Sequence, residues 1–194
     1  FIILFLSGVR RFYLAILGLI AIVSFVILLL IAPYRVQRFT TFLHPELDPK
    51  GVGYQINQSF LAVASGGWWG LGYGQSKQKY QYLPEVQADS IFAILAEEMG
   101  FIISVIFILS FIFLGLRGLK IAKGAPDKYG YLIVGGIISW FVWQAMLNMG
   151  AMVGILPLTG VPLPFVSHGG SALMVGIAAA GIVAGVSRGE QSKV

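Results

Sequence analysis

Four long runs of apolar residues divide the chain, separated by polar or turn-forming segments. The first covers about residues 12–31 and contains no charged residue, and the others cover about residues 90–116, 131–156 and 172–186. A helix of about 20 apolar residues matches the hydrocarbon core of a bilayer, which is roughly 30 Å thick. The pattern predicts an all-α polytopic integral membrane protein with four transmembrane helices. The fourth run is short and rich in Gly and Ala, so it spans only if its helix extends a few residues.

Composition supports a lipid environment. Only 11% of the residues are charged and 57% are hydrophobic, whereas soluble domains carry roughly 25% charged residues. The absence of cysteine excludes disulfides and thiolate metal sites. The sequence begins with Phe1 and shows no signal-peptide pattern, so we expect residues 1–194 to be a fragment of a single membrane domain.

The basic residues predict the orientation of the spans. Eight of them fall on one side of the predicted membrane and five on the other, and the positive-inside rule makes the richer side cytoplasmic. We interpret the net charge of +5 as topology and anionic headgroups rather than as nucleic-acid binding. The predicted outer side then carries a long loop, residues 32–89, and a short Pro/Gly loop, residues 157–171. The eight are Arg10, Arg11, Arg117, Lys120, Lys123, Lys128, Arg188 and Lys193, and the five are Arg35, Arg38, Lys50, Lys77 and Lys79.

The long outer loop has the pattern of an ordered, partly embedded segment. Tyr54 to Ala64 mixes polar and apolar residues in a way that favours a short helix in the membrane interface. A glycine-rich stretch follows and carries Trp68 and Trp69, residues typical of the lipid–water boundary. Irregular backbone at this depth must be buried in protein or line a wet cavity, so we expect a functional site here.

Asp89 is the most prominent candidate for chemistry, because it lies at the start of the second span. One interpretation makes Asp89 or Ser90 a simple helix N-cap. The other makes Asp89 a general base for a hydroxyl, or a metal ligand at a phosphate. Lys77 and Lys79 either contact phosphates of an anionic substrate or lie among the headgroups, and Arg35 and Arg38 have the same two interpretations.

Other polar residues occur inside or beside the predicted spans. Glu97 and Glu98 lie about two turns into the second span, where carboxylates are either paired structurally or functional. Gln144 and Asn148 share one helix face and are typical of contacts between helices. The Pro/Gly loop has a composition that suits re-entry into the membrane and presentation of backbone N–H groups to an anion. His168, within it, is interpreted as an interface residue because two histidines without a cluster form no metal site.

A series of short motifs occurs along the chain in a characteristic order and spacing. They are Arg35-Val-Gln-Arg38, the Asp48-Pro turn, Gly53-Tyr-Gln55, Gln58-Ser59, Gly70-Leu-Gly72, Tyr82-Leu-Pro-Glu85, Asp89, Phe92-Ala93, Glu97-Glu-Met-Gly100 and Pro164-Phe-Val-Ser-His-Gly-Gly-Ser171.

This series of motifs resembles the SEDS family of FtsW, RodA and SpoVE, from about Arg35 to Val186. The stretch from Gln75 to Glu85 is more similar to FtsW, the division member, than to RodA. Two motifs depart from the family pattern: Gln87-Ala-Asp-Ser90 replaces His-Thr-Asp-Phe, and Ser167-His-Gly-Gly-Ser-Ala172 replaces Ser-Tyr-Gly-Gly-Ser-Ser. Gln81 also stands where FtsW members often have Glu.

The resemblance implies a ten-span fold of which this chain supplies the last four spans. It implies a peptidoglycan glycosyltransferase that polymerises lipid II at the outer face of the bacterial cytoplasmic membrane, during cell division or shape maintenance. Undecaprenyl pyrophosphate is released, the partner is a class B penicillin-binding protein, and Asp89 occupies the position of the essential carboxylate.

The candidate substrate-binding residues lie in both predicted outer loops and at the start of the second span. No cofactor motif is evident, and a divalent cation such as Mg²⁺ or Mn²⁺ at Asp89 is the one metal considered. Two alternatives stay open: a flippase for the lipid-linked precursor, and a non-catalytic scaffold of the division machinery. The candidates are Arg35, Arg38, Gln58, Ser59, Lys77, Lys79, Glu85, Glu97, Ser167, Gly169, Gly170 and Ser171.

Overall fold

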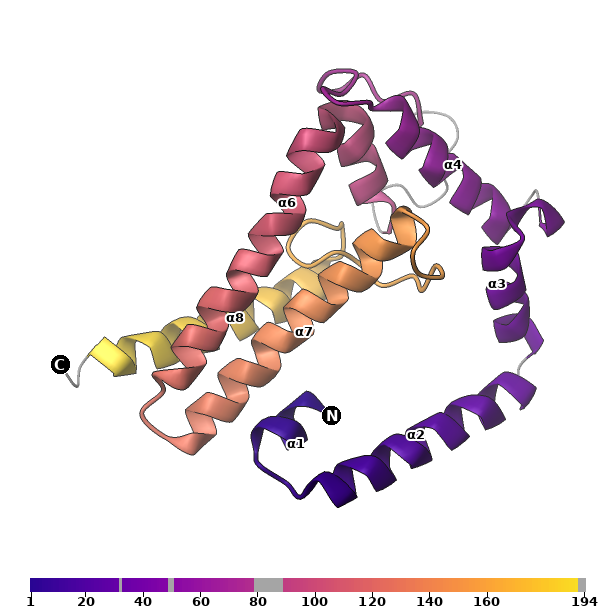
Figure 1. Ribbon diagram of the computed structural model, residues 1–194. Helices are drawn as coiled ribbons and strands as arrows, with labels where there is room; N and C mark the ends of the chain where they lie inside the picture. The colour runs from indigo at the N-terminus through magenta and orange to yellow at the C-terminus, as the bar shows by residue number, and fades with distance from the viewer. Residues whose placement is uncertain (32, 49–50, 79–88, 192–194) are drawn as a thin grey trace.

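The computed structural model describes residues 1–31, 33–48, 51–78 and 89–191, and within these ranges its regular structure is entirely helical (Figure 1). Four of its helices are long and apolar enough to cross a membrane. The predicted all-α architecture with four spans is therefore confirmed. The elements in chain order are α1 (Ile2–Leu6), α2 (Arg11–Ile31), α3 (Pro33–Leu43), the 3-10 turn η1 (Pro45–Leu47), α4 (Val52–Ser65), α6 (Ile91–Lys123), α7 (Lys128–Met152) and α8 (Gly170–Gln191).

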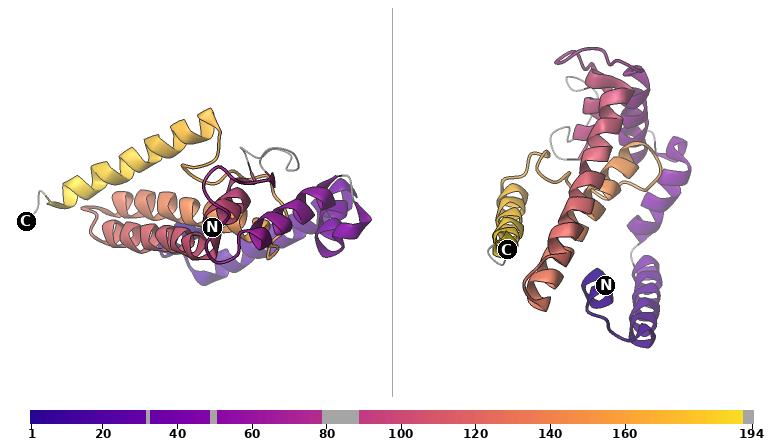
Figure 2. Two further views of the ribbon diagram at one scale, coloured as in Figure 1. Left: turned by 90° about the horizontal axis from the view of Figure 1, so that it is seen from above. Right: turned by 60° about the vertical axis from the view of Figure 1, so that its left-hand side comes forward.

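Helices α6 and α7 form an antiparallel hairpin at the centre of the fold, and α8 is inclined across them (Figure 2). Close approach is possible because α6 presents Gly118 to the side chain of Ile138 on α7. The short connection between the two helices is stabilised by Asp127, whose carboxylate accepts a hydrogen bond of 2.7 Å from Gly130 N–H. The core at the other end of the hairpin contains Phe92, Phe111, Ala145, Met149 and Met152.

Helix α6 is not the continuous helix that the sequence predicts. Gly100 has φ 78° and ψ −178°, a conformation open essentially to glycine alone, and it breaks the helix. Residues 91–99, here called the entry segment, therefore form a separate short helix, and the straight part of the span begins at Phe101. Glu97 and Glu98 belong to the entry segment, so their predicted place within a continuous span is corrected.

A glycine loop, residues 66–74, pairs with this break through backbone hydrogen bonds. Leu71 N–H donates to the carbonyl of Glu97 (2.9 Å), and Gly72 N–H donates to that of Glu98 (3.0 Å). In the other direction, Phe101 N–H donates to the carbonyl of Gly67 (2.8 Å). The loop thus supplies hydrogen-bond partners to backbone N–H and C=O groups that lose their helical partners at the break in α6. Irregular backbone in a membrane protein requires such partners.

The segment that the sequence assigns to a long outer loop contains helices. Helix α4 contains the short helix expected from Tyr54 to Ala64, whereas α3 was not predicted. The sequence did contain a signal for α3. Proline is common at the first position of a helix, and Pro33 is followed by ten residues without another Pro or Gly. Helix α2 lies apart from the hairpin in Figure 1, and Leu14 is its buried residue within the described part of the chain.

The other helix bounds also differ from the expected spans. Helix α6 extends to Lys123, and α7 ends at Met152, because Gly154 turns the chain with φ 76°. Helix α8 begins at Gly170 and has 22 residues, so it is long enough to span. Gly170 and Ser171, expected in the Pro/Gly loop, consequently lie in the first turn of α8.

Candidate functional site

Asp89 lies directly before the entry segment and is half-buried. The N-cap of α6 is Ser90, whose side chain makes no capping hydrogen bond. Of the two residues considered as N-cap, the position thus belongs to Ser90, and the interpretation is wrong for Asp89. Because Asp89 precedes the cap, its place must be explained by contacts with other elements.

The Pro/Gly loop meets Asp89 at Gly160. A Cβ atom added to Gly160 would lie 3.4 Å from Oδ2 of Asp89, so the carboxylate lies close to the Pro/Gly loop at this glycine. Gly160 has φ 69°, a backbone conformation that side-chain-bearing residues rarely adopt. The sequence-distant loop and the carboxylate thus form one junction.

Two amide side chains of α7 hold this junction. Asn148 Nδ2 donates to the carbonyl of Asp89 (2.9 Å) and to that of Val161 (2.8 Å). One turn earlier, Gln144 Nε2 donates to the carbonyl of Pro162 (2.8 Å). The interpretation of these residues as helix-to-helix contacts is corrected, because both bind irregular backbone instead.

Helix α4 packs against the same end of the hairpin. Gln55 Nε2 lies 3.4 Å from the hydroxyl of Ser90. Ser59 is 1% exposed, donates to the carbonyl of Gln55 (2.9 Å) and lies 3.6 Å from the sulfur of Met152. Asp89 is therefore at the meeting point of α4, the entry segment, the end of α7 and the Pro/Gly loop.

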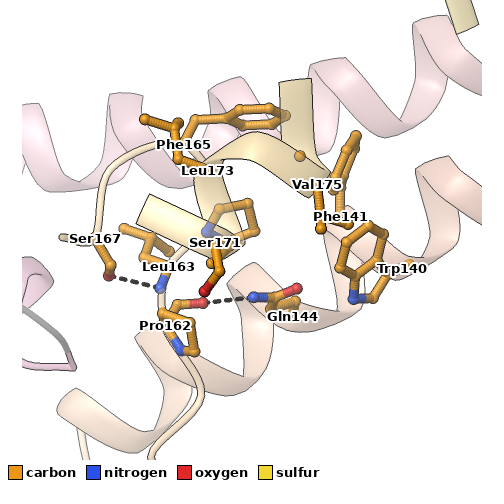
Figure 3. A pocket seen from close by; sticks show the side chains of 13 residues that line it. Trp140, Phe141, Gln144, Pro162, Leu163, Phe165, Ser167, Ser171, Leu173 and Val175 are labelled. Carbon is orange, nitrogen blue, oxygen red and sulfur yellow. Dashed lines mark hydrogen bonds between the residues drawn. The ribbon is translucent and has the colours of Figure 1, made fainter. Parts of the chain in front are cut away.

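A cavity of about 310 Å³ lies between α7, the Pro/Gly loop and the start of α8 (Figure 3). Its walls are mainly aromatic and aliphatic, with Gln144, Ser167 and Ser171 as polar groups. Ser167 Oγ accepts a hydrogen bond of 2.7 Å from Leu163 N–H, which holds the loop closed on itself. Phe165 has φ 65°, an unusual value for a residue with a side chain, and its ring packs edge-on against Phe141.

Glu97 lies in the interior of the protein. It is 1% exposed; Oε2 accepts a short hydrogen bond from the Ser76 hydroxyl, and Oε1 accepts one of 3.1 Å from Lys77 N–H. Both oxygens thus bind the segment that follows the glycine loop. Glu97 thereby fixes the backbone position of Lys77, and a contact with substrate stays a prediction for this residue.

The remaining predicted site residues belong to several different elements. Lys77 is exposed, and Gln58 is half-buried on α4. Arg35 and Arg38 belong to α3, a helix separate from the entry segment, and Arg38 is exposed. Gly169 directly precedes α8. The predictions for Lys79 and Glu85 fall outside the described residues.

The described residues do not supply the donor set of a resident metal ion. Within residues 1–31, 33–48, 51–78 and 89–191, no group of three or more His, Cys, Asp or Glu side chains lies together. Glu85 lies outside the described residues, so a divalent cation at Asp89 stays a prediction.

Asn148 and Gln55 are the site residues whose position sequence reasoning missed. A signal for Asn148 existed: the Pro/Gly loop is rich in proline, which lacks an N–H group, so its carbonyls need donors from elsewhere. An amide pair one turn apart on the preceding helix is a natural source. Gln55 had no comparable signal, because its partner is 35 residues distant in the sequence.

Comparison with known proteins agrees with the fold and the motifs. Residues 1–192 match the FtsW/RodA/SpoVE family, described as a cell cycle protein. Stage V sporulation protein E of Bacillus subtilis is 49% identical over 96% of this chain and 51% of its own length. The probable peptidoglycan glycosyltransferase FtsW of Trichlorobacter lovleyi is 40% identical over 97% of this chain and 49% of its own. Similarity to FtsW is thus confirmed, alongside similarity to a sporulation member.

A solved structure shows the same arrangement of helices. A chain of a peptidoglycan synthase complex, studied for the coordination of polymerization and crosslinking, superposes with a TM-score of 0.75 and 25% identity. The match covers 97% of this chain and 52% of that chain. The present chain spans about half the length of the relatives it matches. Because the family match extends over nearly every residue, the chain belongs to the FtsW/RodA/SpoVE family of cell cycle proteins.

Proposed function

We propose that the protein containing this chain is a peptidoglycan glycosyltransferase that polymerises lipid II into glycan strands. The observation that carries the proposal is the position of Asp89, a half-buried residue whose carboxylate lies close to Gly160 of the Pro/Gly loop, at one end of the helical hairpin. Family membership and the relatives described as probable peptidoglycan glycosyltransferases support the same reaction.

In the proposed reaction, Asp89 acts as the general base. A hydroxyl of the acceptor sugar attacks the anomeric carbon of the donor, and the bond from that carbon to the pyrophosphate oxygen breaks. The hydroxyl proton passes to the carboxylate of Asp89, and undecaprenyl pyrophosphate leaves with the bonding electron pair. A correctly placed base typically contributes about 10²- to 10⁴-fold to the rate of such a step.

The leaving pyrophosphate needs positive charge nearby. Lys77 is exposed, and Glu97 fixes its backbone through the hydrogen bond to Lys77 N–H. Arg38 on α3 is exposed as well. We assign these two cations to recognition of phosphate groups, because charge-assisted hydrogen bonds from Lys and Arg are the strong contacts that phosphate oxygens accept.

The proposed orientation places Asp89 at the outer face of the bacterial cytoplasmic membrane. The basic residues in the last turn of α6, Lys120 and Lys123, lie beside the start of α7, whereas Asp89 is bound by Asn148 near the end of α7. The positive-inside rule makes their side cytoplasmic. A class B penicillin-binding protein is the proposed partner, supported by the match to a chain of a peptidoglycan synthase complex.

A flippase is less well supported than surface chemistry. A flippase requires polar groups along a path through the bilayer, with access from both faces. The straight part of α6 carries no charged residue from Phe101 to Leu116, whereas the polar contacts gather around Asp89. A scaffold would not require an ionised Asp89, so one substitution separates it from the enzyme.

The test is Asp89→Asn in the full-length protein, assayed for polymerisation of lipid II. The amide cannot accept the proton, so we expect turnover to fall about 10²- to 10⁴-fold. Asp127→Asn is the matched control, because Asp127 caps α7 at the other end of the hairpin and Asn caps about as well as Asp. Near-normal polymerisation by Asp89→Asn would remove Asp89 from the mechanism and direct attention to Glu85.

Orientation has a separate test in intact cells. Single cysteines replace Lys77 and Lys123, and an impermeant thiol reagent is added outside. We expect labelling at position 77 and none at position 123, since the two residues lie on opposite sides in the proposed topology. Labelling at position 123 alone would reverse the proposed orientation.

A further inference from the structure

We propose that Asn148 is a positioning residue that sets the place of the Asp89 carboxylate relative to the Pro/Gly loop. This inference rests on the proposed function, in which Asp89 is the general base. Asn148 itself does not touch substrate, because it is 2% exposed and lies beneath the junction. It acts through the two backbone segments that it joins.

The donor geometry requires an amide at this position. Nδ2 carries two N–H groups, and the two carbonyl oxygens at 2.9 and 2.8 Å use both of them. The opposite orientation of the amide would point Oδ1 at two carbonyl oxygens, so the orientation is determined by the contacts. Burial removes competition from water, which makes both hydrogen bonds persistent.

Both acceptors are backbone carbonyls that lie outside the hydrogen-bond ladders of the helices. The carbonyl of Asp89 lies before the N-cap Ser90, whose own carbonyl accepts the first helical hydrogen bonds from Ala93 and Ile94. Val161 precedes Pro162 in a loop that forms no regular helix or strand. A single side chain therefore does for these two carbonyls what secondary structure does elsewhere.

The two hydrogen bonds hold the backbone on both sides of the place where the carboxylate approaches the loop. Asn148 holds the carbonyl of Asp89, and it also holds that of Val161, the neighbour of Gly160, where an added Cβ would lie 3.4 Å from Oδ2. Loss of the amide removes both of these restraints on the distance between carboxylate and loop. Gln144 still ties Pro162 to α7, so the loop stays attached and the fold persists.

The experiment compares Asn148→Leu and Asn148→Asp with Ser139→Ala in the full-length protein. Leu has a similar volume and no donor, and a protonated Asp has one donor in place of two. Ser139 is on the same helix and donates to the carbonyl of Gly135 one turn earlier, so it controls for loss of one hydrogen bond in α7. Lipid II consumption is measured at several concentrations, and thermal midpoints are measured in the same detergent.

We expect kcat of Asn148→Leu to fall about 10- to 100-fold, the effect of a misplacement near 1 Å. KM stays within about twofold, and kcat of Asn148→Asp lies between those of Asn148→Leu and Ser139→Ala. The thermal midpoint of Asn148→Leu falls below that of Ser139→Ala because two buried carbonyls lose their donors, so kcat is compared per folded protein. The inference is overturned if folded Asn148→Leu keeps the kcat of Ser139→Ala, or if kcat falls only in proportion to the folded fraction. Failure of the proposed function gives a different result. In that case the wild-type protein does not polymerise lipid II, or Asp89→Asn polymerises it at a near-normal rate.

Discussion

The two ends of the α6 entry segment are held in opposite ways. Its start is held by side chains: Asn148 binds the Asp89 carbonyl, and Gln55 approaches the Ser90 hydroxyl. Its end is held by backbone hydrogen bonds from the glycine loop to the carbonyls of Glu97 and Glu98, next to the break at Gly100. One short helix thus has a side-chain junction and a backbone junction.

The difference separates residues that adjust activity from residues that maintain the fold. Backbone pairing depends on chain conformation, and at Gly70 and Gly100 it leaves no space for a Cβ. Side-chain pairing depends on a few polar atoms that a substitution removes without moving the chain. We therefore expect substitutions at the Gly100 end to affect folding, and those at the Asp89 end to affect activity more than folding.

Gly100→Ala should have the largest effect on stability. The new Cβ would collide with Gly70 N, and the backbone conformation of Gly100 is strained for any residue with a side chain. We expect a loss of at least about 3 kcal/mol in the free energy of unfolding, measured by titration with SDS in mixed micelles.

A control for Gly100→Ala is available in the glycine loop. Gly74 has φ 79°, and a Cβ added there would meet no atom within 4 Å, so Gly74→Ala experiences the backbone strain without the collision. It should lose only about 1 kcal/mol. Equal losses for the two variants would show that the close approach at Gly100 is unimportant.

Glu97→Ala should come next. The substitution leaves the Ser76 hydroxyl and Lys77 N–H without their carboxylate partner in a buried site. We expect a loss of about 2–3 kcal/mol, with Glu97→Gln losing less because the amide keeps one acceptor. The same SDS titration measures both. A Glu97→Ala protein as stable as wild type would remove this carboxylate from the backbone junction.

Gly160→Ala tests the glycine at the other junction. A Cβ there meets Asp89 Oδ2 at 3.4 Å, an ordinary contact, so the cost is the backbone strain alone. We expect a loss of about 1 kcal/mol in stability and a larger proportional loss in lipid II turnover. A stability loss matching that of Gly100→Ala would abolish the contrast between the two ends.

Ser90→Ala should have the smallest effect. The N-cap hydroxyl makes no capping hydrogen bond, and its contact with Gln55 is long at 3.4 Å. We expect a change below about 0.5 kcal/mol, less than the usual cost of losing a cap, which is about 1 kcal/mol. Thermal unfolding of the detergent-solubilised variant measures the change. A loss of about 1 kcal/mol, the usual cost of losing a cap, would contradict the expectation.

Hydropathy was enough to predict four spans, because the burial of 20-residue apolar segments in lipid leaves a strong pattern in the sequence. It could not reveal the interruption of α6, since the entry segment and the straight part are both helical and mostly apolar. Only the conformation of Gly100 marks the division, and a glycine in a helical sequence pattern is also compatible with an unbroken helix.

The candidate site was predicted in part. Asp89 and the Pro/Gly loop were both named from the sequence, and the structure brings them close together at Gly160. The role of Asn148 was not predicted, because its two partners are 59 and 13 residues distant and are backbone atoms. Contacts to backbone carbonyls leave no complementary residue type in the sequence, so pattern reasoning has nothing to match.

The break at Gly100 also bears on how the chain enters the membrane during synthesis. A charged side chain at the centre of a membrane-inserting helix opposes insertion by about 2.5–3.5 kcal/mol. Because the straight span begins at Phe101, Glu97 and Glu98 lie outside it, and the segment from Phe101 to Leu116 is free of charge. A span that begins at Phe101 therefore presents the insertion machinery with an apolar segment from which both carboxylates are excluded.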